Sequence, residues 1–416
     1  MQAGLSKSQV YIAGICSLIV TAGVARFSFT PLIPIMQTGT GLSDVGAGWL
    51  ATANYLGYML GVLIAASLAS LRHKYLLHQV YLLLSIVTAA AMATTTDFMV
   101  WSVLRFFAGI CGSGGIIIAS GLILKWMIHH DHPGELGIHF AGIGISIVFT
   151  AIVVEALLHL SADWQQQWFA FSVVAILFAI PAWRWMPRPN STDPNATTAV
   201  QDTPPSRQFA ITMLLAYFCA GYGFVVSATF IVDIVEGLNG LQGWGQYIFI
   251  VVGVSAIPAV MLWDLVARRL GTLKALLLAY AIQAIGILLP TLSGALWVII
   301  VCALLFGGTF IACVSLVLTM AGRFYPSNPA KFMGKMTLAY GVAQIVAPVV
   351  TGYLTQIFGN YSPGLYLSVT IMLAGVFLIL RLIRLEAGND FRDCSGNSVT
   401  ENASAAGSLN PKGEAV

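Results

Sequence analysis

The chain has 416 residues, of which 58% are hydrophobic and only 8% are charged. Soluble domains carry about 25% charged residues, so this composition excludes a soluble globular protein. The net charge of +3 comes without a basic stripe, and we therefore expect no nucleic acid among the partners. At about 20 residues for each membrane-spanning helix, the apolar residues suffice for roughly twelve spans.

Twelve apolar runs between polar breaks predict where these spans lie. The predicted spans are residues 10–36, 45–70, 75–95, 98–127, 137–160, 167–186, 209–236, 244–266, 274–292, 295–322, 335–358 and 362–384. The runs are continuously apolar, which favours helices over the alternating strands of a barrel. The first run is too long for a signal peptide, so we interpret it as a span. The predicted fold class is an all-α membrane protein.

The basic residues predict the orientation. If the N-terminus is cytoplasmic, 17 of the 19 Lys and Arg residues fall in inner loops and tails, and only Arg26 and Arg105 lie inside spans. This separation follows the enrichment of Lys and Arg in cytoplasmic loops. We expect a multi-pass protein of the cell membrane with both termini cytoplasmic, in the inner membrane if its source is a Gram-negative bacterium. We expect it to act as a monomer in the lipid bilayer.

A polar stretch at residues 187–208, rich in Pro, Ser, Thr, Asp and Asn, divides the chain near its middle. It predicts a cytoplasmic linker between an N-terminal six-helix bundle at 1–186 and a C-terminal six-helix bundle at 209–384. Residues 385–416 are small and polar, which predicts a disordered cytoplasmic tail. Weak matches recur at a shift of about 199 residues, so the bundles are predicted to be pseudo-symmetric copies. Duplicated bundles are typical of transporters that hold substrate between their halves.

Several strings carry a family resemblance. They are GVARFSFTPLIP at 23–34, ATANYLGY at 51–58, GIHFAG at 137–142, GYGF at 221–224, ATF at 228–230, GTF at 308–310, and Gln344 with Pro348. Over about residues 10–384 the chain resembles the major facilitator superfamily, and within it the YbfB/YjiJ-type subgroup. The resemblance implies a central cavity lined by spans 1, 4, 7 and 10, proton coupling, and an arginine early in span 4, which Arg105 with Gly109 fits. Span 5 lacks the Gly-Pro pair of drug antiporters, which disfavours multidrug efflux.

Three charges lie inside the spans of the first half. An arginine near the bilayer centre costs about 2.5–3.5 kcal/mol, so such residues usually serve a function. Arg26 is about 15 Å from the outer end of its span, and Arg105 and Glu155 also lie in the outer half. One interpretation is a cationic site for an anionic substrate, with Glu155 as a counter-ion or proton carrier. The other is a buried ion pair that fixes helix packing, with Arg105 bonding backbone carbonyls. Two positive charges against one negative charge favour the anionic substrate.

Uncharged polar residues at similar depth complete the predicted site. The candidates for substrate binding are Arg26, Arg105, Tyr58, Asn54, Tyr222, Thr229, Thr309, Tyr340 and Gln344, and the candidates for proton coupling are Glu155, His139 and Asp233. Hydrogen bonding between helices explains the uncharged residues equally well. His139 lies near the cytoplasmic end, where a packing or gating role competes with a pH role. Asp233 lies near the outer surface, where an extracellular gate competes with a proton relay.

We therefore predict a proton-coupled secondary active transporter of a small, anionic organic solute that works by alternating access. Two alternatives stay open: a drug or metabolite efflux antiporter of the same superfamily, and a membrane sensor that does not transport. The chain has no P-loop, so we expect no direct use of ATP, and its six cysteines form no CxxC pair, so we expect no metal site. Ser113 lacks the Gly-x-Ser-Gly spacing of a membrane serine protease, so we expect neither enzyme activity nor a cofactor.

Overall fold

The structure, a computed structural model, describes residues 4–68, 70–130, 136–189, 204–325 and 329–406, with the backbone alone at 322, 329–331 and 387–406. All regular elements within these ranges are helices. They are α1 (Lys7–Leu18), η1 (Ile19–Phe27), α2 (Phe29–Thr40), α3 (Asp44–Ser67), α4 (Leu71–Met92), α5 (Phe98–Ser113), η2 (Gly114–Ala119), α6 (Ser120–His129), α7 (Gly137–His159), α8 (Trp164–Trp185), α9 (Arg207–Glu236), α10 (Gly245–Leu270), α11 (Thr272–Leu292), α12 (Leu296–Phe324), α13 (Pro329–Phe358) and α14 (Ser362–Ala406).

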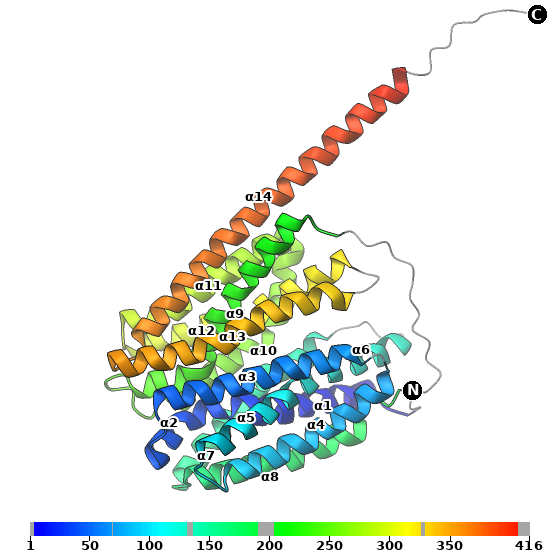
Figure 1. The fold of residues 1–416 in the computed structure, drawn as a ribbon. Coiled ribbons are helices and arrows are strands. Elements are labelled where there is room, and N and C mark those ends of the chain that lie inside the picture. The colour runs from blue at the N-terminus through cyan, green and yellow to red at the C-terminus, as the bar shows by residue number, and fades with distance from the viewer. Residues whose placement is uncertain (1–3, 69, 131–135, 190–203, 326–328, 407–416) are drawn as a thin grey trace, which may run out of the picture.

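These helices make twelve candidate membrane spans, as the apolar runs predict. The first span is formed by α1, η1 and α2 together, and the fourth by α5, η2 and α6. Figure 1 shows two helical bundles side by side, one from each half of the chain. The predicted fold class is confirmed: an all-α membrane protein with twelve transmembrane helices in two pseudo-symmetric six-helix bundles.

Apolar side chains face outward and glycines face inward, as expected of a protein solvated by lipid. Val87 and Phe377 are among many large apolar side chains that are exposed on the bundle surface. Inside the N-terminal bundle, a Cβ atom on Gly57 would overlap the Phe106 carbonyl, and one on Gly109 would overlap the Asn54 carbonyl. The backbones of α3 and α5 therefore touch, which is the usual role of small residues between membrane helices.

The two bundles contact each other most extensively through α3 with α13 and α7 with α10, and α2 also contacts α9 and α10. We call the end that holds Gly41 and Gly359 the outer end, and the end where α6 stops and α9 begins the inner end. In Figure 1 the bundles approach each other at the outer end and diverge toward the inner end. A Cβ atom on Gly144 of α7 would lie 2.6 Å from the Gly253 carbonyl of α10, so these two backbones also touch.

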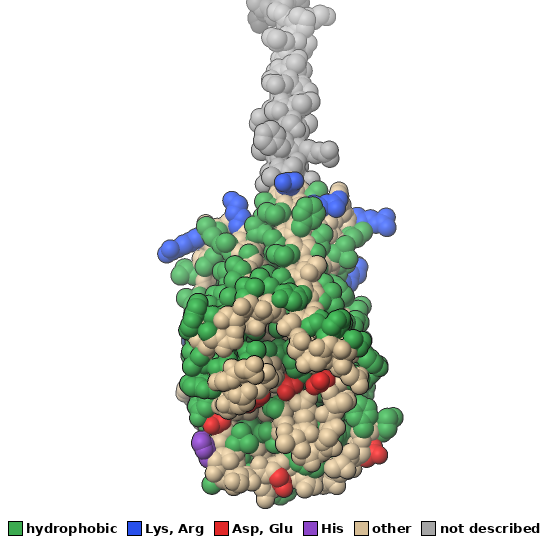
Figure 2. Space-filling model, turned by 90° about the vertical axis from the view of Figure 1, so that its left-hand side faces the viewer, with side chains coloured by type: hydrophobic (Ala, Val, Ile, Leu, Met, Phe, Trp, Pro, Cys, Tyr) green, Lys and Arg blue, Asp and Glu red, His purple; other side chains and the backbone are tan. Residues whose placement is uncertain are grey.

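Charged side chains separate along the molecule. On the face drawn in Figure 2, Lys and Arg gather near the start of the C-terminal tail, while Asp and Glu gather in the opposite half. The expected linker runs between α8 and α9, and its residues 190–203 lie outside the described part of the chain. The backbone of α14 is helical to Ala406, and the cytoplasmic tail expected from residue 385 stays a prediction.

Two spans contain π-helical segments that the sequence did not predict. η1 widens the first span around Arg26, and η2 widens the fourth span. The wide turns leave backbone groups for partners outside the helix. The Gly115 amide of η2 donates to the Thr21 hydroxyl of η1 at 3.0 Å, and the Gly115 carbonyl lies 3.2 Å from Nε2 of His139. The two widened spans are thus fastened to each other and to α7.

Candidate functional site

The outer halves of the two bundles are joined by hydrogen bonds between side chains and backbone. The Thr30 hydroxyl donates to the Ala228 carbonyl at 2.7 Å, and the Gln246 amide donates to the Pro31 carbonyl at 3.1 Å. Nearer the middle of the molecule, the Thr52 hydroxyl donates to a carbonyl of α13 at 2.8 Å. These contacts close the outer end, and some of the predicted site residues, such as Arg26, Asn54 and Thr229, lie beside them.

Arg26 is held by aromatic rings from both bundles. Its guanidinium carbon lies 4.7 Å from the ring centre of Tyr55, 4.9 Å from Tyr58, and 5.5 Å from Phe27. A fourth ring, Phe224 of α9 in the C-terminal bundle, lies 5.7 Å away. Only 8% of the Arg26 surface is exposed, and its Nε has no hydrogen-bond partner. Rings attract a cation through their faces but accept few of its N–H groups, so this guanidinium keeps donors for a ligand.

Arg105 is held more tightly, by its own bundle alone. Its Nη1 donates to the Ala25 carbonyl at 3.2 Å, and its guanidinium carbon lies 4.5 Å from the ring centre of Phe29. The Asn54 amide ties the same region together, donating to the Ala25 carbonyl at 3.1 Å and to the Arg105 carbonyl at 3.0 Å. The backbone contact expected of Arg105 under the structural interpretation is therefore present.

Neither arginine has a negative partner among the described residues. No carboxylate of these residues lies within 4.0 Å of either guanidinium, and ion pairs join His159 to Glu155 and Arg268 to Asp264 instead. The buried ion pair proposed as the structural alternative is therefore not formed with Glu155. A buried charge without a partner is costly and is usually retained for function. The arrangement provides a region of positive potential between the bundles.

A small cavity adjoins both arginines. It is lined from the N-terminal bundle by Arg26, Asn54, Tyr55 and Arg105, and from the C-terminal bundle by Ala228 and Thr229, among others. The Tyr55 and Thr229 hydroxyls are 3.2 Å apart and bridge it. It leaves room for little more than one water molecule. With the outer end closed, residues of both bundles therefore surround the two arginines.

The structure brings some of the other predicted residues to this place and leaves others apart. Asn54 and Thr229 line the cavity, and Tyr340 of α13 stacks on Phe224 at 6.0 Å. Gln344 lies one turn beyond Tyr340 on the same helix, and its buried Oε1 has no partner. The Thr309 hydroxyl donates to the Leu305 carbonyl of its own helix. The buried Tyr222 hydroxyl has no partner, and no hydrogen bond or ring contact within the described ranges joins Tyr222, Thr309 or Gln344 to Arg26.

Two of the three predicted proton-coupling residues lie away from the cavity. Glu155, at the outer end of α7, accepts a hydrogen bond at 2.8 Å from the hydroxyl of Tyr247 on α10 and lies 3.2 Å from His159. It thus joins the two bundles at their rim. His139 is fully buried, with Nε2 on the Gly115 carbonyl and Nδ1 packed against Gly14. These contacts place His139 among packing contacts beside η2.

The third, Asp233, belongs to a carboxyl pair that the sequence did not predict. Tyr361, between α13 and α14, donates its hydroxyl to Asp233 of its own bundle and, at 3.5 Å, to Asp44 of the other bundle. Burial and the neighbouring Asp233 and Asp44 carboxylates raise the pKa of the Tyr361 hydroxyl well above its usual range, so it stays protonated and donates. Gln37 also donates to Asp44, at 2.8 Å. We call Asp44 and Asp233 the outer carboxyl pair, and Tyr361 is the tyrosine that donates to both of them.

Sequence reasoning left Tyr55, Phe224, Asp44 and Tyr361 out of the site. Tyr55 lies between the predicted Asn54 and Tyr58 on α3, so helical spacing was a usable signal for it. No local signal places Asp44 beside Tyr361, because they are 317 residues apart and meet only after the bundles dock.

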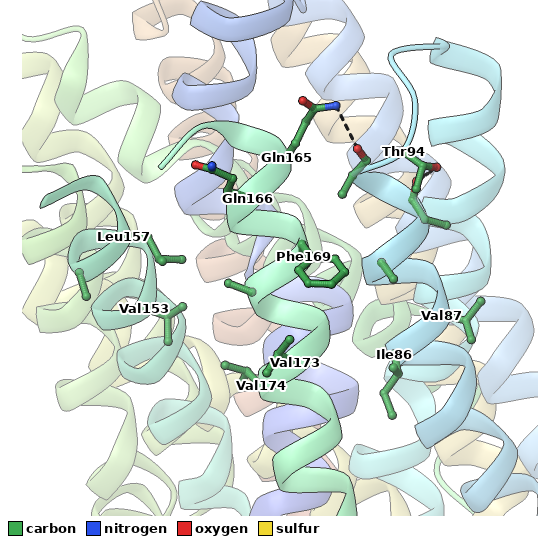
Figure 3. A pocket seen from close by; sticks show the side chains of 15 residues that line it. Ile86, Val87, Thr94, Val153, Leu157, Gln165, Gln166, Phe169, Val173 and Val174 are labelled. Carbon is green, nitrogen blue, oxygen red and sulfur yellow. Dashed lines mark hydrogen bonds between the residues drawn. The ribbon is translucent and has the colours of Figure 1, made fainter. Parts of the chain in front are cut away.

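A wide apolar groove on the flank of the N-terminal bundle is a different kind of feature. Figure 3 shows its lining from α4, α7 and α8, with Val87, Val153 and Phe169 among the labelled side chains. Gln165, at its outer rim, donates to the Ala93 carbonyl at 3.2 Å. The groove carries no charged residue and lies on the flank rather than between the bundles, where transporters bind substrate. Nor do the described residues bring three His, Cys, Asp or Glu side chains together as a metal site would require.

Two duplicated six-helix bundles with a polar site between them define a transporter of the major facilitator class. The chain belongs to the family described as "Uncharacterised MFS-type transporter YbfB", which matches residues 18–380. The subgroup resemblance of the sequence strings is thereby confirmed, and the protein is a transporter and not an enzyme.

More distant relatives agree on the class. Solute carrier family 22 member 20 of Mus musculus is 32% identical to this chain over 137 residues. The matched part makes up 31% of this chain. The match spans only 23% of that relative's length. Two crystal structures of the nucleoside transporter NupG, one of them a point mutant, share the fold at 10% identity. Their TM-scores are 0.72 for the mutant and 0.70 for the other, over 90% and 91% of this chain and 99% and 98% of theirs.

Proposed function

We propose that the protein is a proton-coupled secondary transporter of a small anionic organic solute. The single observation that carries the anionic class is the pair of buried arginines that have no carboxylate partner in the described part of the chain, next to a cavity that both bundles line. Arg26 is the residue we assign to the anion, because its guanidinium lies among rings from both bundles, whereas Arg105 contacts its own bundle and donates to the Ala25 carbonyl. A carboxylate fits the fork of a guanidinium with two parallel hydrogen bonds.

The proposed transport cycle follows from where the bundles touch. The hydrogen bonds between bundles lie in the outer half, and the bundles diverge toward the inner end. Solute enters and leaves the arginine site as the bundles rock about it. The gathering of Lys and Arg near the C-terminal tail supports a cytoplasmic inner end with both termini inside.

For the proton we assign the outer carboxyl pair rather than Glu155 or His139. Two carboxylates that share one tyrosine hydroxyl repel each other unless one of them is protonated. Asp44 and Asp233 belong to different bundles, so a proton bound there favours closure of the outer end. Glu155 also joins the bundles, through Tyr247, and stays the competing carrier.

The anion assignment is tested by thermal unfolding of the purified protein in the presence of organic acids, sugars, amino acids and cationic drugs. A ligand present at 100 times its Kd stabilises the folded state by about 2.7 kcal/mol. We expect stabilisation by organic carboxylates in the wild type and in Arg268→Gln, a matched change of an exposed arginine, and none in Arg26→Gln. Equal stabilisation of Arg26→Gln by the same carboxylate would remove Arg26 from the site.

The proton assignment is tested in proteoliposomes with an imposed pH gradient. The most stabilising carboxylate should accumulate inside wild-type vesicles only when the gradient is present. Asp233→Asn should lose this accumulation and keep exchange of solute for solute, while Glu155→Gln should keep both. The opposite outcome would transfer the role to Glu155, and accumulation that ignores the gradient would exclude proton coupling.

A further inference from the structure

The C-terminal bundle presents a set of stacked rings to Arg26. We call Tyr217 and Phe224 of α9, Phe306 and Phe310 of α12, and Tyr340 of α13 the aromatic bank. Phe224 lies 5.2 Å from Phe310 with 26° between the ring planes, and Phe306 lies 5.4 Å from Phe310 with 19° between them. Tyr340 lies 6.0 Å from Phe224, at 30°, and 4.7 Å from Tyr217, at 37°.

The bank joins several near-parallel rings in one cluster, with four of its five ring pairs at 30° or less. Elsewhere in the described chain, Trp101 with Trp164 and Phe149 with Phe178 meet edge to face, at 84° and 77°, while Trp126 stacks on His130 at 25° and Phe230 meets Tyr361 at 35°. Parallel rings present their faces in a common direction, and a flat aromatic ligand stacks on such faces with offset geometry. The bank therefore has the form of a surface for a flat ring.

Phe224 connects the bank to the cation. It is the one ring of the bank within 6 Å of the Arg26 guanidinium, at 5.7 Å, and it also stacks on Phe306, Phe310 and Tyr340. A ligand whose carboxylate reaches Arg26 would thus place its body against Phe224 and the bank. The bank rings are at most 8% exposed while the outer end is closed, so a bound ring would be shielded from water.

We propose that the Arg26 site takes an aromatic carboxylate, whose carboxylate binds the guanidinium and whose ring stacks against the aromatic bank. The proposal rests on the proposed function as an anion transporter and adds the class of solute. The N-terminal bundle supplies charge through Arg26, and the C-terminal bundle supplies aromatic faces, so the solute contacts both halves. A solute that touches both halves is what couples binding to rocking.

The test compares four probes on the full-length protein, by thermal unfolding and by equilibrium binding. Benzoate and naphthoate carry an aromatic ring and a carboxylate, cyclohexanecarboxylate carries the charge without the flat ring, and benzamide carries the ring without the charge. We expect the aromatic carboxylates to bind roughly three- to tenfold more tightly than cyclohexanecarboxylate, the range that ring stacking adds beyond apolar burial. Benzamide should bind far more weakly than benzoate.

Two variants separate ring stacking from apolar packing. Phe310→Leu keeps an apolar side chain and removes one ring of the bank, so it should abolish the preference for benzoate over cyclohexanecarboxylate without lowering affinity for the latter. Phe324→Leu, on the same helix but in contact with Phe209 and Phe332, is the matched control and should keep the preference. Unfolding temperature without ligand reports whether either variant is misfolded, and Tyr217→Leu serves as a second bank variant.

The outcomes separate this inference from the proposed function. Equal binding of benzoate and cyclohexanecarboxylate, lost together in Arg26→Gln, would overturn the aromatic class and leave the anion site intact. A preference for benzoate that survives in both Phe310→Leu and Tyr217→Leu would remove the bank from the site. Failure of all carboxylates to bind, or binding that ignores Arg26→Gln, would overturn the proposed anion function and this inference with it.

Discussion

Replacing Arg26 with methionine should separate the function of this residue from its contribution to stability. The buried guanidinium has no carboxylate partner among the residues that the structure describes, so its removal relieves an insertion cost of about 2.5–3.5 kcal/mol. The change also removes the attraction of the surrounding rings, about 0.5–2 kcal/mol. The difference predicts that Arg26→Met folds as stably as the wild type, or more stably by up to about 3 kcal/mol.

Arg105→Met is the informative comparison. It relieves a similar cost but also removes the hydrogen bond to the Ala25 carbonyl and the contact with Phe29, and a charged hydrogen bond contributes about 1.5–3 kcal/mol. The assay is thermal unfolding of each purified variant in detergent, monitored by tryptophan fluorescence in the absence of ligand. We expect the unfolding temperature of Arg26→Met to equal or exceed that of the wild type, with Arg105→Met below both. A marked fall for Arg26→Met alone would show that Arg26 is structural and would contradict the assignment of its guanidinium to a ligand.

Two further predictions concern contacts between the bundles. Tyr361→Phe removes the hydroxyl that Asp44 and Asp233 share across the two bundles, which should weaken closure of the outer end. A cysteine introduced at the outer end should then react faster with an impermeant maleimide. Unchanged labelling would exclude this tyrosine from outer closure. Gly144→Val places a side chain against the Gly253 carbonyl, where overpacking costs about 1–3 kcal/mol. We expect slower solute exchange and a lower unfolding temperature, and normal exchange would mean that α7 and α10 need not pack this closely.

Much of the fold could be predicted because the bilayer restricts what a chain can do. A span must be long, apolar and helical, and the runs around Leu177 or Phe377 satisfy all three conditions without reference to the rest of the chain. The glycine contact of Gly57 was also accessible, because small residues four apart favour close helix approach. The widened turns of η1 and η2 were not, since they depend on partners such as Thr21 that come from another span.

The site was predictable only as far as charge and depth define it. Arg26 and Arg105 were identified because a cation in an apolar run is conspicuous. Phe224 was not assigned to binding, because a phenylalanine in a membrane helix is usually packing, and its role emerges only when Arg26 of the other bundle lies over it. The pairing of Asp44 with Tyr361 required the docked bundles, which no local pattern encodes.

The lack of a counter-ion at Arg26 among the described residues has an electrical consequence for the proposed cycle. A bound carboxylate cancels the positive charge of Arg26, and a proton bound at the outer carboxyl pair restores one unit of charge to the loaded carrier. Net flux of one carboxylate with one proton should therefore depend little on an applied potential. Flux of the carboxylate without a proton should depend on it, by up to about 2.3 kcal/mol per 100 mV if the charge crosses the whole field.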